Sequence, residues 1–356
     1  MKVFFKILRN ALWQKGKENL PEELLEREAK KLLYLAEKQT VSGMVVDVLY
    51  GNSIKMPEEQ FYEAMAYKMQ VEQWNSQVNR TLKELVALMD SHKIKYVVVK
   101  GQIVASYYPK PSTRQAGDID YYCDKENFEK LIKVLQAEWG IKAEVNNSDK
   151  HVDFARNDVT LEGHFSLLSL YSKRTRLYWQ KIVEEDKGES NTIDGTEVKT
   201  LSPTLHTLYV FMHLYHHLME LGVGLRQFCD LAVMLHYAKE KIDRETLRQH
   251  IEALGMEKAF RACGSVLVRN LGLEAQDFPY VLTDGDHKYG KKILDVVMYR
   301  GNMGHYNKRN GFSGWKHKVE AMGIKTAHFF KFMPLAPAYS VQWLLHEFGR
   351  KVLKRE

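Results

Sequence analysis

The chain has few of the residues that would mark a disulfide scaffold or a metal finger. Its 356 residues contain only three cysteines, which are scattered and form no CxxC pair: Cys123, Cys229 and Cys263. This spacing excludes a zinc finger and a disulfide-stapled fold, and it indicates buried, inert thiols in a reducing compartment. The chain also contains no internal repeat and no low-complexity linker. These absences favour an ordinary globular protein.

Long apolar runs are missing as well. None approaches the ~20 residues that a membrane-spanning helix needs. The first residues, MKVFFKILRNALW, are basic like a signal peptide, but Lys6 and Arg9 interrupt the apolar stretch. The spacing predicts a helix whose apolar face packs on the rest of the protein, formed by Val3, Phe4, Ile7, Leu8, Ala11 and Leu12. A helix lying on a membrane surface is the alternative. We therefore expect no transmembrane segment and a cytoplasmic location.

The charge is only modestly unbalanced. Lys and Arg number 52 against 45 Asp and Glu, which gives a net charge of +7 and a pI near 9.0. Such a surplus favours anionic partners: nucleotides, nucleic acid or a membrane surface. The stretch from Lys308 onward mixes basic and aromatic residues, but no nucleic-acid-binding motif organises it. We interpret it as a solvated helical tail, with nucleic acid as an open but not favoured partner.

The apolar pattern divides the chain into three parts. Residues 1–92 have helical periodicity, and Pro57 stands where the first turn of a long helix belongs. Residues 93–201 alternate strands with helices, with hairpin turns predicted at Asn157-Asp158 and Asp194-Gly195. Residues 202–356 return to helical spacing. We predict an α+β fold with a helical N-terminal segment (1–92), a mixed β-sheet core (93–201) and a helical C-terminal domain (202–356).

The strongest functional pattern lies in residues 96–124, YVVVKGQIVASYYPKPSTRQAGDIDYYCD. A short apolar strand leads into Lys100-Gly101, and a second predicted strand carries Asp118 and Asp120. Side chains alternate along a strand, so the two carboxylates project from one face while their apolar neighbours point into the core. Adjacent carboxylates repel each other, whereas a hard cation such as Mg²⁺ binds them together with phosphate oxygens. The pattern therefore predicts a metal site.

This pattern resembles the DNA-polymerase-β-type nucleotidyltransferase superfamily, and more closely its bacterial family of uncharacterised nucleotidyltransferases. The family motif runs Lys-Gly, Tyr-Pro, Arg and Gly-Asp-Ile-Asp. The matching residues here are, in order, Lys100, Gly101, Tyr108, Pro109, Arg114, Gly117, Asp118, Ile119 and Asp120. The resemblance covers about residues 95–235 and implies a nucleotidyltransferase fold with the nucleotide between core and helical domain. It implies transfer of a nucleoside monophosphate from an NTP such as ATP to a hydroxyl acceptor, dependent on Mg²⁺ or Mn²⁺ and releasing pyrophosphate.

In that superfamily a third acid from a neighbouring strand completes the metal site. Glu162, in VTLEGHF, is our candidate, so that Asp118, Asp120 and Glu162 would be the catalytic metal ligands. The family usually shows Asp-x-His here, and Glu162 is one methylene longer. Asp153, on the other strand of the predicted hairpin, is the competing candidate. His164 would orient a carboxylate, approach the acceptor or be merely structural.

The phosphate-binding turn departs from the superfamily, because Lys100-Gly101 replaces a glycine-serine pair. Gly101 would let backbone N–H groups approach phosphate at the start of a helix, and Lys100 would add a positive charge. Arg114 offers a bidentate fork for phosphate oxygens, with an ion pair to Asp118 or Asp124 as the alternative. The resemblance thus implies that Lys100, Gly101 and Arg114 bind the triphosphate.

The predicted helical domain carries further polar residues. His206, His213 and His217 fall on one helical face, but no carboxylate or cysteine stands at metal-ligand spacing beside them. Arg226 and Asp230, one turn apart, match an Arg-x-x-x-Asp pattern of the relatives. They would form a structural clamp or line the nucleotide cleft.

The motif does not define the acceptor. The resemblance favours a sugar or another small hydroxyl compound, with protein or tRNA behind it. Two hypotheses of other classes stay open. The chain would be a nucleotide-binding regulator if the lysine turn and the longer third acid have abolished catalysis. Alternatively it would be a basic scaffold that binds nucleic acid or membrane in a salt-sensitive way and ignores NTP.

Overall fold

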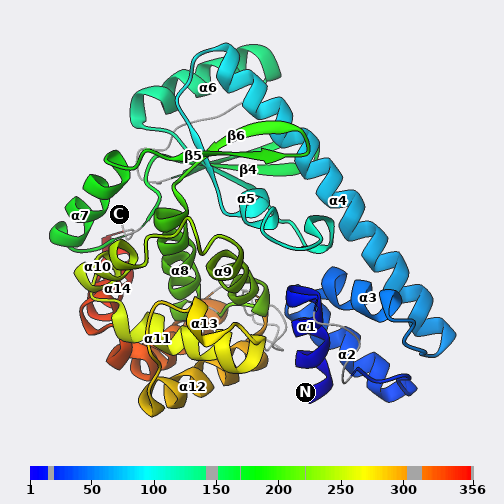
Figure 1. Cartoon of the computed structure of the whole chain (residues 1–356). Coiled ribbons are helices and arrows are strands. Elements are labelled where there is room, and N and C mark those ends of the chain that lie inside the picture. The colour runs from blue at the N-terminus through cyan, green and yellow to red at the C-terminus, as the bar shows by residue number, and fades with distance from the viewer. Residues whose placement is uncertain (15–19, 142–150, 169, 221, 303–314, 354–356) are drawn as a thin grey trace. The chain divides into compact units, whose positions relative to one another are not determined.

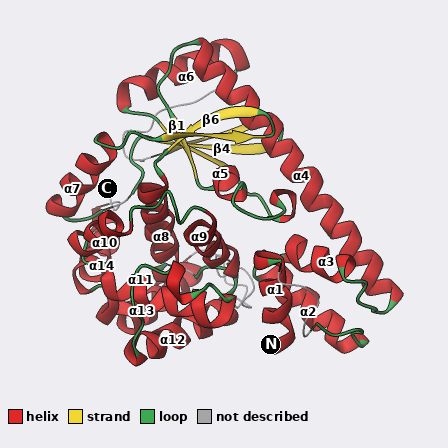
Figure 2. Ribbon diagram, in the orientation of Figure 1, coloured by secondary structure: helices red, strands yellow, loops and turns green. Residues whose placement is uncertain are grey.

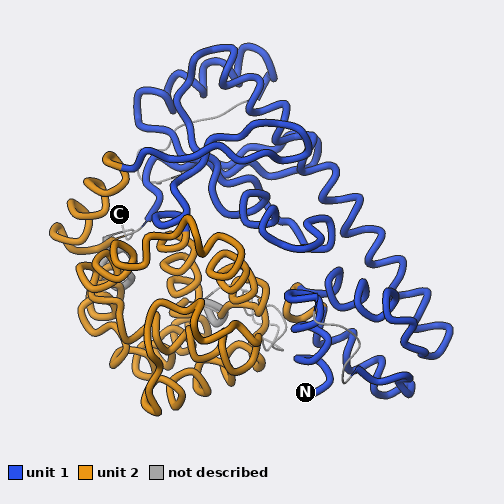
Figure 3. The backbone as a smooth tube through the Cα atoms, viewed as in Figure 1, with its two compact units in different colours: residues 1–36, 41–168, 186–206 blue, residues 37–40, 169–185, 207–356 orange. Residues whose placement is uncertain are grey.

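The computed structural model describes residues 1–14, 20–141, 151–168, 170–220, 222–302 and 315–353. The chain divides into two compact units (Figure 3). Unit 1 contains residues 1–36, 41–168 and 186–206, and unit 2 contains residues 37–40, 169–185 and 207–356. Helices dominate both (Figure 2), and every strand of the described residues belongs to unit 1. The α+β class is therefore confirmed, whereas the three-domain division stays a prediction.

Helices form the N-terminal part of unit 1, as the periodicity predicted. They are α1 (Lys2–Trp13), α2 (Glu26–Lys38), α3 (Ser42–Gly51) and the long α4 (Glu58–Ser91). Pro57 is the N-cap residue of α4. The buried face of α1 contains Phe5 and leaves Val3 exposed, which shifts the predicted face by a small rotation. The other predicted apolar positions at Phe4, Ile7, Leu8 and Leu12 are buried.

A four-stranded mixed sheet forms the centre of unit 1 (Figure 1). Its strands are β1 (Val97–Val99), β2 (Ile119–Tyr122), β3 (His151–Arg156) and β4 (Val159–His164), in the order β1-β2-β4-β3. The two central strands, β2 and β4, run parallel, and each outer strand is antiparallel to its neighbour. Ile119 and Tyr121 lie in the hydrophobic core, as strand alternation predicted.

Turn residues mark the ends of these strands. Asn157 and Asp158 have φ values of 52° and 62°, as a two-residue hairpin turn between β3 and β4 requires. Asp194 and Gly195 likewise adopt positive φ between β5 (Glu189–Ile193) and β6 (Thr196–Thr200), which form a separate two-stranded sheet. Helix α6 (Lys125–Trp139) ends at Gly140 in the left-handed conformation. The two predicted hairpin turns are confirmed.

The connection from β1 to β2 contains two short helices. These are α5 (Gly101–Ala105) and the 3₁₀ turn η1 (Pro111–Thr113). Both belong to unit 1. The amide of Asn75 on α4 donates hydrogen bonds to the carbonyl oxygens of Ser112 and Arg114, each at 2.9 Å. Helix α4 thus holds the segment that leads into β2.

Unit 2 is helical throughout its described residues. Its elements are α7 (Lys173–Glu184), α8 (Pro203–Met219, which begins in unit 1), α9 (Leu225–Tyr237), α10 (Arg244–Ala253), α11 (Glu257–Val266), the π-helical turn η2 (Leu267–Leu271), the 3₁₀ turn η3 (Ala275–Asp277), α12 (Asp284–Arg300), α13 (Trp315–Phe332), the 3₁₀ turn η5 (Met333–Leu335) and α14 (Pro337–Leu353). All three cysteines of the chain are buried, as predicted. None of the helices in the described residues is long and apolar enough to cross a membrane. The predicted basic tail begins at Lys308, partly outside the described residues.

Candidate active site

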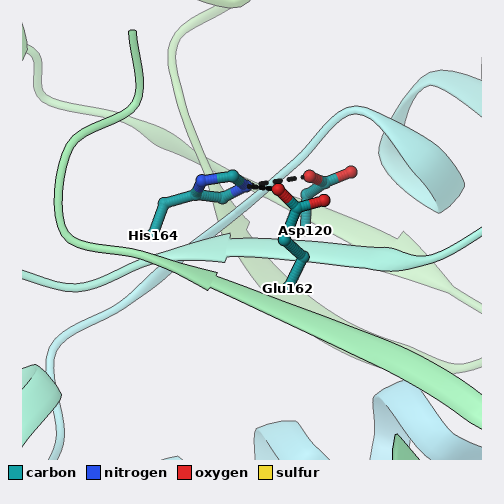
Figure 4. A group of neighbouring side chains, drawn as sticks. All are labelled: Asp120, Glu162 and His164. Carbon is teal, nitrogen blue, oxygen red and sulfur yellow. Dashed lines mark hydrogen bonds and ion pairs between the residues drawn. The ribbon is translucent and has the colours of Figure 1, made fainter. Parts of the chain in front are cut away.

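The sheet register brings two acidic residues together on neighbouring strands. Asp120 of β2 pairs with Glu162 of β4, and Tyr122 pairs with His164. Paired residues on adjacent strands share a face, and so do residues two positions apart on one strand. Asp120, Glu162 and His164 therefore project from the same face of the sheet. Figure 4 shows their side chains converging.

The three side chains form a tight polar group. His164 Nε2 lies 2.9 Å from Asp120 Oδ1 and 3.5 Å from Glu162 Oε1. One ligand atom from each residue lies within 4.8 Å of the other two, a spacing compatible with binding of one cation. Asp120 and His164 are buried and Glu162 is partly exposed. The group is thus accessible from one side through Glu162.

Lys100 contributes the fourth polar side chain of this group. Its Nζ lies 2.6 Å from Asp120 Oδ1, so the lysine predicted to bind phosphate contacts a predicted metal ligand in this structure. Its backbone has φ 54° and ψ −139°, a conformation that side-chain-bearing residues rarely adopt. The Lys100 N–H donates a 2.9 Å hydrogen bond to Nε2 of His206, a buried residue of α8. His206 thereby holds the turn that aims Lys100 at Asp120.

Charges in the group shift both acidic pKa values, in opposite directions. Burial disfavours the ionised form of Asp120, but the Lys100 ammonium and the His164 ring outweigh it and lower its pKa. Burial and then the Asp120 charge raise the pKa of Glu162 to about 7, although Lys100 and His164 act in the opposite sense. One carboxyl group is therefore ionised while its neighbour is near half protonation at neutral pH.

Asp118 and Asp153, the other predicted acids, lie outside this group of three. Asp118 immediately precedes β2 and is partly exposed. Its charge contributes to the raised pKa of Glu162, which places it within electrostatic reach of the group. Asp153 pairs with Glu162 across β3 and β4 but is exposed. Among the described residues, the carboxylate that meets Asp120 is therefore that of Glu162.

The two remaining predicted phosphate ligands follow Lys100 in the chain. Gly101 has φ +36°, and a Cβ atom there would lie 3.4 Å from the carbonyl oxygen of Asp118. A glycine thus lets the turn approach the start of β2. Helix α5, which begins at Gly101, has only five residues, so its dipole adds little positive charge. Arg114 is buried directly after η1. Phosphate binding by both residues stays a prediction.

Gly163 explains how Glu162 and His164 are held at this face. It lies between them on β4, and a Cβ atom there would come within 2.6 Å of Tyr121 Oη and 2.7 Å of Phe128 Cε2. The absence of a side chain lets the two aromatic rings pack directly under the strand. The aromatic core packed on one face of β4 therefore fixes the positions of Glu162 and His164, which project from the opposite face.

The three histidines predicted to share one face of α8 make separate contacts. His206 contacts the Lys100 turn, whereas His213 and His217, in unit 2, hydrogen-bond each other through their Nε2 atoms at 3.0 Å. Sequence spacing had grouped all three on one face and gave no sign of the His206–Lys100 contact, which joins residues 106 positions apart. Asp230 of α9 is buried and Arg226 is partly exposed, and their role as a clamp or nucleotide contact stays a prediction.

A small mixed sheet with acids on neighbouring strands, beside a Lys-Gly turn, defines a nucleotidyltransferase-like protein. The chain belongs to the family described as uncharacterised nucleotidyltransferase, whose profile matches residues 26–272. That match extends well beyond both ends of the segment that carries the sequence motif. It covers the whole sheet and the helices from α2 to η2.

Comparisons with individual proteins add little to the family assignment. No curated protein matches the chain. Among solved structures, an antigenic nucleotidyltransferase-like protein from Paracoccidioides brasiliensis is similar at 14% sequence identity and a TM-score of 0.36. The similarity covers 58% of this chain and 98% of that one. A likeness this weak supports no conclusion about function.

Proposed function

We propose that the protein transfers a nucleoside monophosphate from an NTP to a hydroxyl acceptor in a reaction that depends on a divalent cation. The observation that carries this proposal is the convergence of Asp120, Glu162 and His164 on two parallel strands of a chain in this family. The acceptor oxygen would bond to the α-phosphorus as the bond to the β-phosphate breaks. The acceptor proton leaves to solvent, and pyrophosphate is the second product.

The donor set fits a divalent cation. Two carboxylates and an imidazole offer ligand atoms within 4.8 Å of one another, and carboxylate oxygens are the ligands that Mg²⁺ and Mn²⁺ prefer. Asp118, Asp120 and Glu162 would hold the cation, with His164 hydrogen-bonding Asp120 to fix its orientation. A bound cation would supply positive charge to the phosphate oxygens and lower the pKa of the acceptor hydroxyl.

Three residues of the β1–β2 connection would bind the triphosphate. Lys100 carries an ammonium group at the site, and a triphosphate would give this group a second anionic partner beside Asp120. Gly101 would allow phosphate oxygens to approach the backbone of the turn. Arg114 would add a guanidinium fork from the segment that α4 holds. Together these residues would position the α-phosphate against the acceptor.

Two observations favour a second candidate, a nucleotide-binding regulator without catalysis. The Lys100 ammonium already neutralises Asp120, and Glu162 has a pKa of about 7. Both effects weaken the attraction of the site for a cation. Such a regulator would bind NTP without releasing pyrophosphate over hours, whatever acceptor is offered.

Binding of each NTP, measured by calorimetry with and without Mg²⁺, tests the site without knowledge of the acceptor. We expect Mg²⁺-dependent binding that Asp118→Asn and Asp120→Asn each weaken by at least about tenfold. Asp158→Asn is the matched control, since it removes one carboxylate in the exposed β3–β4 turn. Equal binding by wild type and Asp120→Asn would refute the proposed site. Pyrophosphate release in an acceptor screen then separates the enzyme from the regulator.

A further inference from the structure

Unit 1 contains a polar cavity beside α5 that the proposed chemistry does not use. Its volume is about 340 Å³, within the range of small-molecule pockets. Four elements form its walls: α4, α5, the η1 segment and the β5–β6 hairpin. Most lining residues have polar side chains, including Asn75, Asn79, Gln102, Ser106, Ser112 and Asp194, and apolar surface is added by Ala105, Pro111 and Ile193. The cavity is large enough for a monosaccharide or a compound of similar size.

Two buried amides in this lining have acceptor atoms without donors. Asn75 is 2% exposed and Gln102 is 6% exposed. Among the described residues, no group donates a hydrogen bond to Asn75 Oδ1 or to Gln102 Oε1. Buried polar atoms are almost always hydrogen-bonded, so an acceptor left without a donor points to a ligand or solvent group that supplies one. Both oxygens are enclosed in the wall of the cavity, so a ligand donor reaches them once the neighbouring side chains of the lining move.

Hydrogen bonds donated by the amide nitrogens of Asn75 and Gln102 set the orientation of both side chains. The Asn75 Nδ2 group donates to the carbonyl oxygens of Val71, Ser112 and Arg114, each at 2.9 Å. The Gln102 Nε2 group donates to Asn79 Oδ1, and Asn79 in turn donates to Asp194 Oδ2. Rotating either amide by 180° would place an oxygen where a donor is needed. The orphaned oxygens are therefore fixed features of the lining.

The lining chemistry defines the kind of ligand. It contains no lysine, arginine or histidine, and its one charged residue is the carboxylate of Asp194, so it disfavours a phosphate group. It also contains no aromatic ring on which a nucleobase would stack. Amides, serine hydroxyls and a carboxylate instead suit a compact, non-planar ligand rich in hydroxyl donors, or one that also carries an amino group.

We propose that this cavity is the acceptor subsite and binds a neutral or amino sugar, or a polyol of similar size, through hydroxyl donors to Asn75 and Gln102. Gln102 follows Lys100-Gly101 directly, so α5 joins the cavity wall to the turn that contacts Asp120. The assignment as an acceptor subsite rests on the proposed nucleotidyl transfer. The binding of such a compound in the cavity does not.

Binding of a defined panel to the full chain tests this proposal. The probes are glucose, glucosamine and myo-inositol, with glucose 6-phosphate as the anionic counterpart, each at about 10 mM by saturation-transfer NMR, with and without Mg²⁺ and a non-hydrolysable NTP. The blocking variant is Ser76→Trp, which fills the cavity from an exposed position of α4. The control is Gln70→Trp, an exposed position of the same helix outside the lining.

We expect at least one neutral or amino compound to bind, and to bind more tightly than the phosphate ester. Ser76→Trp should weaken that binding by at least about tenfold, and Gln70→Trp should leave it unchanged. Absence of binding by every probe, or binding that Ser76→Trp does not affect, would overturn the inference. NTP binding measured on the same variants keeps the two proposals separate. If the wild-type protein bound a sugar probe but no NTP, nucleotidyl transfer alone would be refuted. If it bound NTP but none of the sugar probes, the subsite alone would be refuted.

Discussion

The partly buried carboxyl group of Glu162 should make the stability of the metal-free protein depend on pH. Burial and the neighbouring Asp120 charge raise its pKa from 4.5 to about 7. A group whose pKa is higher in the folded state contributes stability that is fully present below its unfolded pKa and is lost as the pH rises through its folded pKa. The stability that Glu162 contributes is therefore lost between about pH 4.5 and somewhat above pH 7.

The size of this effect follows from the two pKa values. Complete titration from 4.5 to about 7 corresponds to about 3 kcal/mol, and most of this change falls between pH 5 and pH 8.5. Asp120 acts in the opposite sense, because its pKa is lowered and its contribution is lost only as the pH falls through and below its ordinary value of 3.8. Asp120 therefore contributes little to the slope above pH 5.

Glu162→Gln isolates this contribution, since glutamine keeps the shape and removes the titrating group. We expect the free energy of unfolding of the variant, measured by urea denaturation in EDTA, to rise relative to wild type by about 2–3 kcal/mol between pH 5 and pH 8.5. Glu197→Gln, at an exposed position of β6, should show no such change. Parallel pH profiles for wild type and Glu162→Gln would refute the reasoning about the site's electrostatics.

Three further substitutions test the packing and contacts around the site by urea denaturation. Gly163→Ala should cost about 1–3 kcal/mol, because its Cβ would overlap the Tyr121 ring. His206→Ala should cost about 1–3 kcal/mol, because the buried N–H of the Lys100 turn loses its acceptor. Asp120→Asn should cost about 3 kcal/mol in the metal-free protein, because the Lys100 ammonium loses its counter-charge.

Each of these predictions has a matched comparison. Gly51→Ala meets no atom within 4 Å, so equal costs at Gly51 and Gly163 would contradict the packing argument. His206→Gln again provides a hydrogen-bond acceptor for the Lys100 N–H. This variant should therefore be more stable than His206→Ala and close to wild type. Asp118→Asn should change stability by less than about 0.5 kcal/mol, since Asp118 is partly exposed and outside the buried group. A cost as large as that of Asp120→Asn would contradict this assignment.

Local sequence chemistry predicted the two hairpin turns and the face of β2 that carries Asp120. Asn157-Asp158 and Asp194-Gly195 adopt the positive φ values that their residue types favour, because turn geometry depends on a few neighbouring residues. The family motif likewise located Asp120 and Glu162 on neighbouring strands. Alternation placed Asp118 beside Asp120, but it could not reveal that β2 begins only at Ile119.

Contacts between distant parts of the chain could not be predicted. The ion pair of Lys100 with Asp120 depends on a left-handed backbone that lysine does not favour, and a histidine 106 positions away stabilises it. The polar cavity similarly depends on how α4 packs against the η1 segment. Both features are set by tertiary structure, for which a single sequence shows no periodic pattern.

The parallel pairing of β2 with β4 has a consequence for how the site forms. Asp120 and His164 are 44 positions apart, and their strands meet only after the chain has closed a long crossover through α6 and β3. Such a closure is a late, entropically costly event, so no short fragment of unit 1 contains the complete group. A ligand that binds the group therefore recognises only the fully folded unit, and its binding free energy stabilises that unit as a whole. Ligand-induced thermal protection would accordingly report the cooperative folding of unit 1.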